Sequence, residues 1–194
     1  MWEKILKNRK GFIISAPSSG SGKTTLTLGL IRAFSEKRKV QPFKNGPDYI
    51  DTQFQSLSAN TDSYNLDTWA MSPNQIFKII NSAGDHSLCI VEGSMGLFDG
   101  VLKGKYSFTG STADLSRLTG WPIILVVDCA KQAQSSAALV YGFKTYRPDI
   151  QIAGVILNNV SSARHQNLLV SEITKTKVPI LGIMPKSPDI EIPE

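Results

Sequence analysis

The segment with the clearest chemical potential is Ala16-Pro-Ser-Ser-Gly-Ser-Gly-Lys-Thr-Thr25, which lies between an apolar run and a helical pattern. Successive backbone N–H groups in such a loop, with the helix N-terminus behind them, form a cradle for phosphate oxygens. Lys23 could then reach the β- and γ-phosphates of a nucleotide, and the Thr24 hydroxyl could coordinate Mg²⁺. The strict phosphate-loop pattern has glycine where this chain has Pro17, so a plain Gly/Ser turn remains the alternative. The nucleotide-contacting residues predicted here are Ser19, Gly20, Ser21, Gly22, Lys23, Thr24 and Thr25.

A second polar block, Lys44-Asn-Gly-Pro-Asp-Tyr-Ile-Asp51, follows the next apolar run. One cation and two carboxylates, Asp48 and Asp51, could bind metal-bridged phosphates and position an acceptor group. A turn followed by a helix-capping aspartate explains the same local spacing equally well. Both interpretations stay open at this point.

Two further carboxylates follow the third apolar run. Glu92 ends a run that is expected to be buried, where a carboxylate is unfavourable unless it is paired or binds a metal, so we favour a Mg²⁺ ligand. Asp99 lies seven residues further on, in a glycine-rich loop, and could join the same ion or face solvent. Asn158 is expected to close the fifth strand, where its amide suits an adenine edge or a turn.

Apolar runs and helical patterns alternate along the whole chain and would position these groups. Strands are predicted at 11–15, 40–44, 87–92, 123–128, 152–157 and 179–184, and helices at 23–37, 73–84, 111–120, 132–146 and 163–175. Continuous apolar strands alternating with helices indicate a single α/β domain, with a mostly parallel sheet covered by helices on both faces.

Two stretches, 45–67 and 93–110, lack this regularity and are predicted to be irregular loops. Both follow strand ends, where open α/β sheets place their ligands, so we expect them to be functional. The residues after Met184 contain three prolines in ten positions and predict a linker.

Composition excludes several classes of protein. The chain has 194 residues, 41% of them hydrophobic and 19% charged, as in one globular domain. Its longest purely apolar run, 123–127, is too short for a membrane span, and the N-terminus lacks the apolar region of a secretory signal. The net charge of +5 is too small to predict nucleic-acid binding. Cys89 and Cys129, each in an apolar run, indicate buried thiols and a cytoplasmic protein.

Four blocks together resemble the cobyrinic acid a,c-diamide synthase family, and the resemblance covers nearly the whole chain. They are the phosphate loop, Gln41-Pro-Phe-Lys-Asn-Gly-Pro-Asp-Tyr-Ile-Asp51, Asn65-Leu-Asp67 and Val91-Glu-Gly-Ser-Met-Gly-Leu-Phe-Asp-Gly100. The fold that the resemblance implies is the P-loop fold of dethiobiotin synthetase, which shares the relaxed phosphate loop.

The resemblance implies that ATP phosphorylates the a- and c-acetate groups of cobyrinate or hydrogenobyrinate, and that ammonia then displaces each phosphate. It assigns Thr24, Asp48 and Glu92 to Mg²⁺. It also implies catalytic or substrate-positioning roles for Lys44, Asp51 and Asp99, and places Lys23, Asn158 and Pro185 in the ATP site, with Asn158 facing adenine. The family commonly has Asn-Arg where this chain has Asn158-Asn159.

The resemblance further implies a synthetase domain over residues 1–184. Residues 185–194 would begin the linker to a glutamine amidotransferase domain that this chain does not contain, so ammonia would come from that domain or from solution. A homodimer is a further implied arrangement. The expected partners are a tetrapyrrole carboxylate and that missing domain, without nucleic acid or membrane.

Two alternatives remain. The first is the nickel-sirohydrochlorin a,c-diamide synthase of the same family. The second is a P-loop partitioning or switch ATPase, although such proteins usually have a signature lysine where this chain has Ser18. The Gly-Pro-Asp-Tyr-Ile-Asp block argues against dethiobiotin synthetase and cobyric acid synthase themselves.

Overall fold

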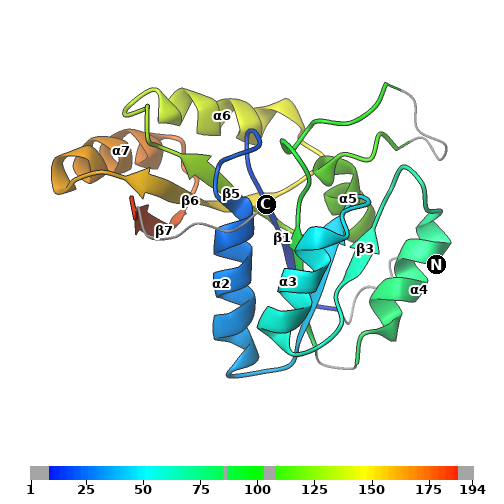
Figure 1. Cartoon of the computed structure of the whole chain (residues 1–194). Coiled ribbons are helices and arrows are strands. Elements are labelled where there is room, and N and C mark those ends of the chain that lie inside the picture. Colours follow the sequence, from blue (N-terminus) through cyan, green and yellow to red (C-terminus); the bar gives the residue numbers. More distant parts are fainter. Residues whose placement is uncertain (1–8, 85–86, 103–107, 188–194) are drawn as a thin grey trace.

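The computed structural model describes residues 9–84, 87–102 and 108–187, in which strands and helices alternate (Figure 1). The strands are β1 (Gly11–Ser15), β2 (Val40–Asn45), β3 (Tyr64–Leu66), β4 (Leu88–Glu92), β5 (Ile123–Asp128), β6 (Ile152–Val160) and β7 (Ile180–Pro185). The helices are α2 (Lys23–Ser35), α3 (Ile50–Ala59), α4 (Pro73–Ser82), α5 (Thr112–Thr119), α6 (Ser136–Tyr146) and α7 (Ala163–Lys175).

The seven strands form one parallel sheet in the order β3-β2-β4-β1-β5-β6-β7. Strand β1 therefore lies at the centre, with β4 on one side and β5 on the other. The chain runs from β1 into the phosphate loop, so this loop lies above the middle of the sheet. Ligand sites in open parallel sheets lie at such a point, beyond the carboxyl ends of the strands.

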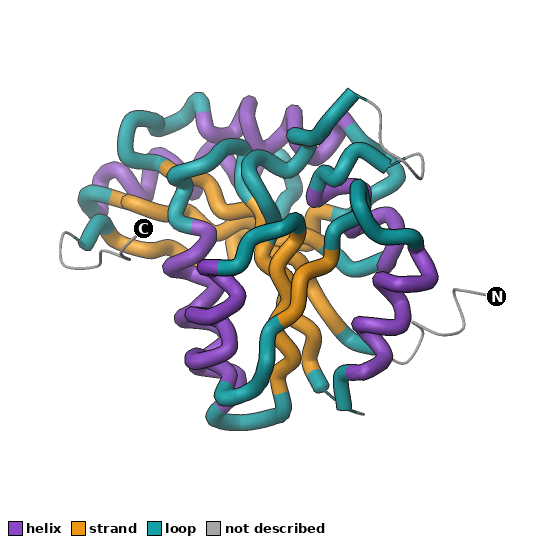
Figure 2. The backbone as a smooth tube through the Cα atoms, turned by 45° about the vertical axis from the view of Figure 1, so that its right-hand side comes forward, coloured by secondary structure: helices purple, strands orange, loops and turns teal. Residues whose placement is uncertain are grey.

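Helices cover both faces of the sheet, as Figure 2 shows. In β1 the side chains alternate: Ile13 belongs to a buried cluster that includes apolar residues of α4, α5, α6 and α7, whereas Ile14 belongs to a second cluster that includes Ile31 of α2. Both side chains are fully buried, as expected of a strand in the centre of a parallel sheet. This arrangement confirms the predicted fold class.

Local signals that were visible in the sequence set several helix ends. Ser72 and Gln75 form a capping box at the start of α4, and the Ser111 hydroxyl accepts a hydrogen bond from the Asp114 N–H at the start of α5. Helix α5 ends at Gly120, whose φ of 70° is the left-handed conformation that glycine adopts readily. These three ends were predicted correctly.

The prediction that 45–67 is irregular was wrong, because this stretch contains α3 and β3. Helix α3 escaped detection because its buried face is polar: Thr52 and Gln55 are buried, whereas Leu57 is 77% exposed. The apolar periodicity that normally marks a helix is therefore absent from its inner face. Strand β3 is only three residues long and lies at the edge of the sheet.

Several boundaries also differ from the prediction, two of them by three residues or more. Helix α6 begins at Ser136 rather than 132, after a series of turns. Strand β6 continues to Val160, so Asn158 lies inside it, paired with Asp128, instead of closing it. Asn159 has a φ of 58° and lies where the register with β7 shifts, an irregularity that composition does not indicate.

The prediction that 93–110 is irregular holds where this stretch is described. Between β4 and α5, the described residues form neither helix nor strand, as predicted, and 103–107 lie outside the described residues. Most of the predicted linker, 188–194, also lies outside them. No helix among the described residues combines the length and apolarity needed to span a bilayer.

Candidate active site

The phosphate loop joins β1 to α2 and leaves its backbone donors open. Gly20 and Gly22 have φ values of 74° and 87°, which side-chain-bearing residues rarely adopt. Gly22 is also the N-cap of α2, and no side chain there accepts a hydrogen bond from the first turn. The first-turn N–H groups of a helix have no intrahelical acceptor, so this end of α2 is suited to an anion.

Two hollows meet at this loop. A large cavity of about 1000 Å³ extends over the ends of β2, β3 and β4 and is lined by Lys23, Thr24 and Glu92, among others. A smaller groove of about 420 Å³ lies on the other side, over β5, β6 and β7. Gly20 borders both hollows. A ligand that binds along the loop would thus have one end in each hollow.

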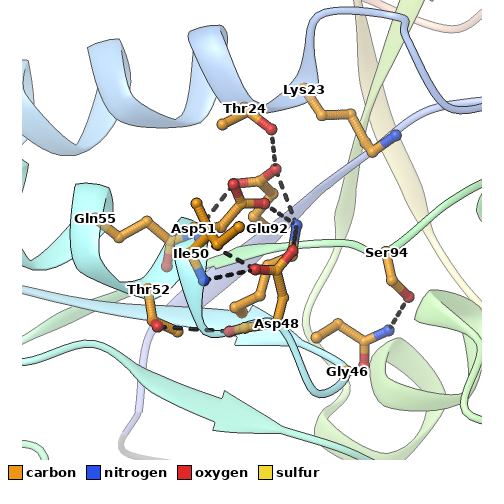
Figure 3. A network of polar contacts seen from close by, with 12 residues as sticks. Lys23, Thr24, Gly46, Asp48, Ile50, Asp51, Thr52, Gln55, Glu92 and Ser94 are labelled. Atoms are coloured by element: carbon orange, nitrogen blue, oxygen red, sulfur yellow. Dashed lines mark hydrogen bonds and ion pairs between the residues drawn. The ribbon is translucent and has the colours of Figure 1, made fainter. Parts of the chain in front are cut away.

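A buried charge network forms the floor of the large cavity (Figure 3). The Lys44 ammonium forms ion pairs with the carboxylates of Asp51 and Glu92, and its distance to Glu92 Oε1 is 3.1 Å. The Thr24 hydroxyl donates to the same Glu92 oxygen over 2.6 Å. The structure thus brings together a cation, two carboxylates and a hydroxyl that are far apart in the sequence.

Burial shifts the proton affinities of this network. Burial raises the pKa of Glu92 above its usual range, although the Lys44 charge opposes that shift. Burial also disfavours the charged form of Lys44, but Glu92 and Asp51 outweigh it and raise the pKa of this lysine. Lys23 has a lowered pKa because burial prevails over the attraction of Glu92. Lys23 donates to the Ser18 carbonyl over 3.2 Å and has no carboxylate within ion-pair distance among the described residues.

Sequence reasoning missed Gln55, a member of the charge network. Its side chain is fully buried in α3, and Nε2 donates to Glu92 Oε2 over 2.9 Å. Its Oε1 accepts a hydrogen bond from the Ser63 hydroxyl over 2.8 Å, which fixes the amide orientation. Figure 3 shows Gln55 reaching the carboxylate from the opposite side to Thr24. The one signal in the sequence was the pair of polar residues, Thr52 and Gln55, at helical spacing after a capping aspartate.

Asp48 has the capping role that the sequence left open. Its Oδ1 accepts hydrogen bonds from the N–H groups of Ile50 and Asp51, at 2.9 and 3.1 Å. The other carboxylate oxygen lies 3.8 Å from Lys44 Nζ, and the residue lines the large cavity. The two interpretations of this aspartate are therefore compatible.

Asp99 also lines the large cavity and accepts a hydrogen bond from the Gly96 N–H over 2.9 Å. A side chain at Gly96 would clash, because an added Cβ would lie 2.6 Å from both Asp99 Oδ2 and the Pro17 carbonyl. The glycine-rich loop is thus packed directly against the phosphate loop, with Asp99 at their junction.

The smaller groove contains Gly22, Thr25, Asn158 and Pro185 of the predicted residues. Asn158 Nδ2 donates to the Ser21 carbonyl over 3.0 Å and so ties β6 to the phosphate loop. Neither Ser21 nor Asp51 lines either hollow: the Ser21 side chain is buried within the loop, and Asp51 forms an ion pair with Lys44.

The protein itself offers few ligands for a metal ion. Among the described residues, no three His, Cys, Asp or Glu side chains gather closely enough to hold one. The hydroxyl of Thr24 and the carboxylate of Glu92 are nevertheless hard oxygen donors of the kind that Mg²⁺ prefers. An ion at this place would take its remaining ligands from phosphate oxygens and water. Cys89 and Cys129 are not candidates, since both are buried and burial raises the pKa of each thiol to about 11.

Comparison with known proteins agrees with this geometry. The model of the CbiA family, described as the CobQ/CobB/MinD/ParA nucleotide binding domain, matches residues 12–194. Hydrogenobyrinate a,c-diamide synthase of Brucella anthropi is 47% identical over 188 residues, which cover 95% of this chain and 42% of that protein. The enzyme of the same name from Rhodobacter capsulatus is 46% identical over 186 residues, 95% of this chain and 43% of that protein. The chain therefore spans less than half the length of these relatives.

Solved structures support the fold alone. The hydrogenase maturation factor HypB from Archaeoglobus fulgidus superimposes with a TM-score of 0.60 at 14% identity, over 94% of this chain and 87% of that one. Chloroplast FtsY from Physcomitrella patens gives a TM-score of 0.62 at 14% identity, over 94% and 66%.

Proposed function

The chain belongs to the CbiA family of nucleotide-binding domains, and from this premise we propose that it is the synthetase part of an ATP-dependent, amide-forming ligase. Its acceptor would be a tetrapyrrole carboxylic acid. Hydrogenobyrinate is the first candidate, because relatives at 46–47% identity are named hydrogenobyrinate a,c-diamide synthase. One observation carries the proposal: a groove and a charge-lined cavity meet at the phosphate loop, one on each side of it. Phosphate transfer from a nucleotide to a second substrate requires such an arrangement.

In this proposal ATP lies along the loop with its adenine in the smaller groove. The Asn158 amide borders that groove and offers hydrogen-bonding groups suited to the adenine edge, and Pro185 closes the groove on the β7 side. The phosphates lie over Gly20 and Gly22 at the start of α2. Lys23 lines the large cavity, so its ammonium is placed for the β- and γ-phosphates.

Mg²⁺ would be held by Thr24 and Glu92, with Asp48 at the edge of the cavity as a further carboxylate. When bound, the ion neutralises phosphate charge and orients the terminal phosphate. Gln55 holds the second oxygen of Glu92, so the first oxygen keeps a fixed direction toward Thr24.

The acceptor carboxylate would enter the large cavity near Lys44 and Asp99. A carboxylate oxygen attacks the γ-phosphorus, the bond to the ADP oxygen breaks, and an acyl phosphate forms. Ammonia then attacks the carbonyl carbon, phosphate leaves with the former carboxylate oxygen, and the nitrogen loses its surplus proton to solvent. The protein contributes charge neutralisation by Lys23 and Lys44 and in-line positioning by Asp99. Asp51, which does not line the cavity, acts by holding the Lys44 ammonium in place.

Ser18 separates this proposal from a partitioning or switch ATPase. Such proteins usually have a lysine here, whereas this chain has a serine whose carbonyl accepts a hydrogen bond from Lys23.

The ammonia source in our proposal is a glutamine amidotransferase domain of the whole protein, in keeping with relatives more than twice as long as this chain. The chain alone should therefore use free ammonia.

The test is ATP-dependent amidation by this chain with ammonium and a panel of acceptors: hydrogenobyrinate, cobyrinate, nickel-sirohydrochlorin and diaminopelargonate. We expect amidation of a tetrapyrrole and no product from diaminopelargonate or from glutamine as nitrogen donor. A folded Lys23→Ala protein should lose both ATP affinity and turnover. ATP hydrolysis that no acceptor stimulates, with no amide formed, would contradict the proposal.

A further inference from the structure

Besides Tyr49, which is 77% exposed, three large apolar side chains stand exposed inside the large cavity, although its floor is charged. Trp69, Met95 and Val101 all line it, and their exposed fractions are 50%, 61% and 47%. Trp69 lies in the segment after β3, whereas Met95 and Val101 both lie in the loop between β4 and α5. Exposed apolar groups that gather in a concave site mark a ligand surface more often than scattered surface residues do.

The backbone holds Trp69 in place, while its ring is free to make contacts. Asp67 Oδ1 accepts hydrogen bonds from the N–H groups of Trp69 and Ala70, at 2.9 and 3.2 Å. Gly110 packs against the tryptophan, because an added Cβ there would lie 3.1 Å from the Trp69 Cβ. Among the described residues, the indole makes no hydrogen bond and no ring contact.

Met95 has a backbone conformation that residues with a side chain rarely adopt. Its φ of 43° lies in the left-handed region, which non-glycine residues seldom adopt outside turns. Such strain persists where the surrounding structure enforces it, and it is found most often at ligand sites. In this case it accompanies a side chain that is more than half exposed.

One buried amide joins the segments that carry these side chains. Asn45 Nδ2 donates to the Ser94 hydroxyl over 2.8 Å, next to Met95, and lies 3.2 Å from the Gly110 carbonyl, beside Trp69. On the same loop, the Val101 N–H donates to the Thr109 carbonyl over 2.9 Å. Trp69, Met95 and Val101 thus belong to one connected wall, named the apolar wall below.

We infer that the apolar wall binds one face of the tetrapyrrole ring and thereby selects a macrocyclic acceptor over small carboxylic acids. This inference rests on the proposed function and assigns the substrate contact within it. The cavity of about 1000 Å³ is far larger than a carboxylate and a terminal phosphate require. Its charged floor suits the reacting carboxylate, and its wall suits a flat apolar ring that carries such carboxylates.

A nucleotide base is the other flat ring available to the site. The groove that borders Asn158 lies on the opposite side of the phosphate loop, so a base bound there cannot reach the wall. A fall in ATP affinity when the wall is changed would therefore count against the inference.

The test uses Trp69→Ala, Trp69→Phe and Met95→Ala, with Tyr141→Ala as the control, since Tyr141 is 57% exposed and lies outside the cavity. Hydrogenobyrinate binding, hydrogenobyrinate KM and ATP binding are measured for each protein. Tricarballylate, which has carboxylates but no ring, serves as a competitor. We expect Trp69→Ala to raise the hydrogenobyrinate Kd and KM about tenfold, with ATP and tricarballylate affinities unchanged.

Trp69→Phe should retain most of the affinity because it keeps an aromatic face, and Met95→Ala should lose several-fold. If the wild type amidates hydrogenobyrinate but the wall variants behave like Tyr141→Ala, the wall inference is wrong and the proposed function stands. If the wild type neither binds nor amidates any tetrapyrrole, the proposed function fails and the inference fails with it.

Discussion

Replacing Lys44 with methionine tests the buried charge network most sharply. Lys44 and Glu92 have side-chain exposures of 6% and 1%, and their charged atoms are 3.1 Å apart. Methionine matches the apolar stem of lysine, from Cβ to Cε, but lacks the ammonium group and its charge. Glu92 and Asp51 then lose their shared cation, while Thr24 and Gln55 continue to donate to Glu92.

The magnitude follows from the burial of the pair. At an effective dielectric constant of about 20, two charges at this distance attract by about 5 kcal/mol. Removing one partner of a buried pair typically costs about 3–5 kcal/mol. We expect about 3 kcal/mol, because two hydrogen bonds remain and the raised pKa of Glu92 lets it take up a proton. For a domain of this size that corresponds to a fall of about 6–12 °C in Tm.

The loss should depend on pH. In the variant, Glu92 loses the Lys44 charge that lowers its pKa, so burial raises this pKa further above the unfolded value than in wild type, and the folded variant binds more protons than folded wild type does. Stability relative to wild type therefore falls as pH rises, and the deficit should be smaller at pH about 5 than at about 8.

Urea unfolding of four proteins measures this effect: wild type, Lys44→Met, the double variant with Glu92→Gln, and Lys78→Met as an exposed-lysine control. The double variant should regain most of the loss, and the control should remain within about 0.5 kcal/mol of wild type. A loss below about 1 kcal/mol, or a double variant no more stable than the single one, would refute the argument.

Two further substitutions test the phosphate loop and the buried Gln55. Gly22→Ala should abolish nucleotide binding and lower Tm, because the added Cβ would lie 2.2 Å from Asn158 Nδ2 and the backbone φ is 87°. The control Gly142→Ala, on α6 with open space around the added Cβ, should change neither property. A Gly22→Ala protein with unchanged nucleotide affinity by calorimetry would contradict the prediction. Gln55→Leu should raise the Mg²⁺ concentration needed for ATP binding about tenfold, because Glu92 loses the donor on its second oxygen. A Mg²⁺ titration that matches wild type, even with a lowered Tm, would reduce Gln55 to a packing role.

The sequence was sufficient for the fold because the central strands have strong, agreeing signals. Strands such as Leu88–Glu92 are continuous apolar runs, and helices such as Pro73–Ser82 begin with recognisable caps. The lateral order of the strands depends on pairings between distant segments, so local patterns cannot specify it. Ile50–Ala59 was missed because it buries polar side chains that serve the site.

Sequence reasoning named many of the residues that line the two hollows, but not their contacts. Glycine spacing and a strand-end carboxylate identified the phosphate loop and Glu92. The shared ion pair of Lys44 with Glu92 joins positions 48 residues apart, and no local pattern reveals it. Gln55 and Trp69 could not be assigned, because an amide or an indole gains chemical meaning only from its neighbours in space.

The central claim is that ATP activates the substrate carboxylate as an acyl phosphate, and its most direct test traces a carboxylate oxygen into the released phosphate. Hydrogenobyrinate with carboxylates labelled by a heavy oxygen isotope is incubated with this chain, ATP and ammonium, and the inorganic phosphate is analysed by mass spectrometry. If ATP activates the carboxylate, each amide formed should release one phosphate that carries a heavy oxygen from the substrate. Amide formation with unlabelled phosphate would contradict the account.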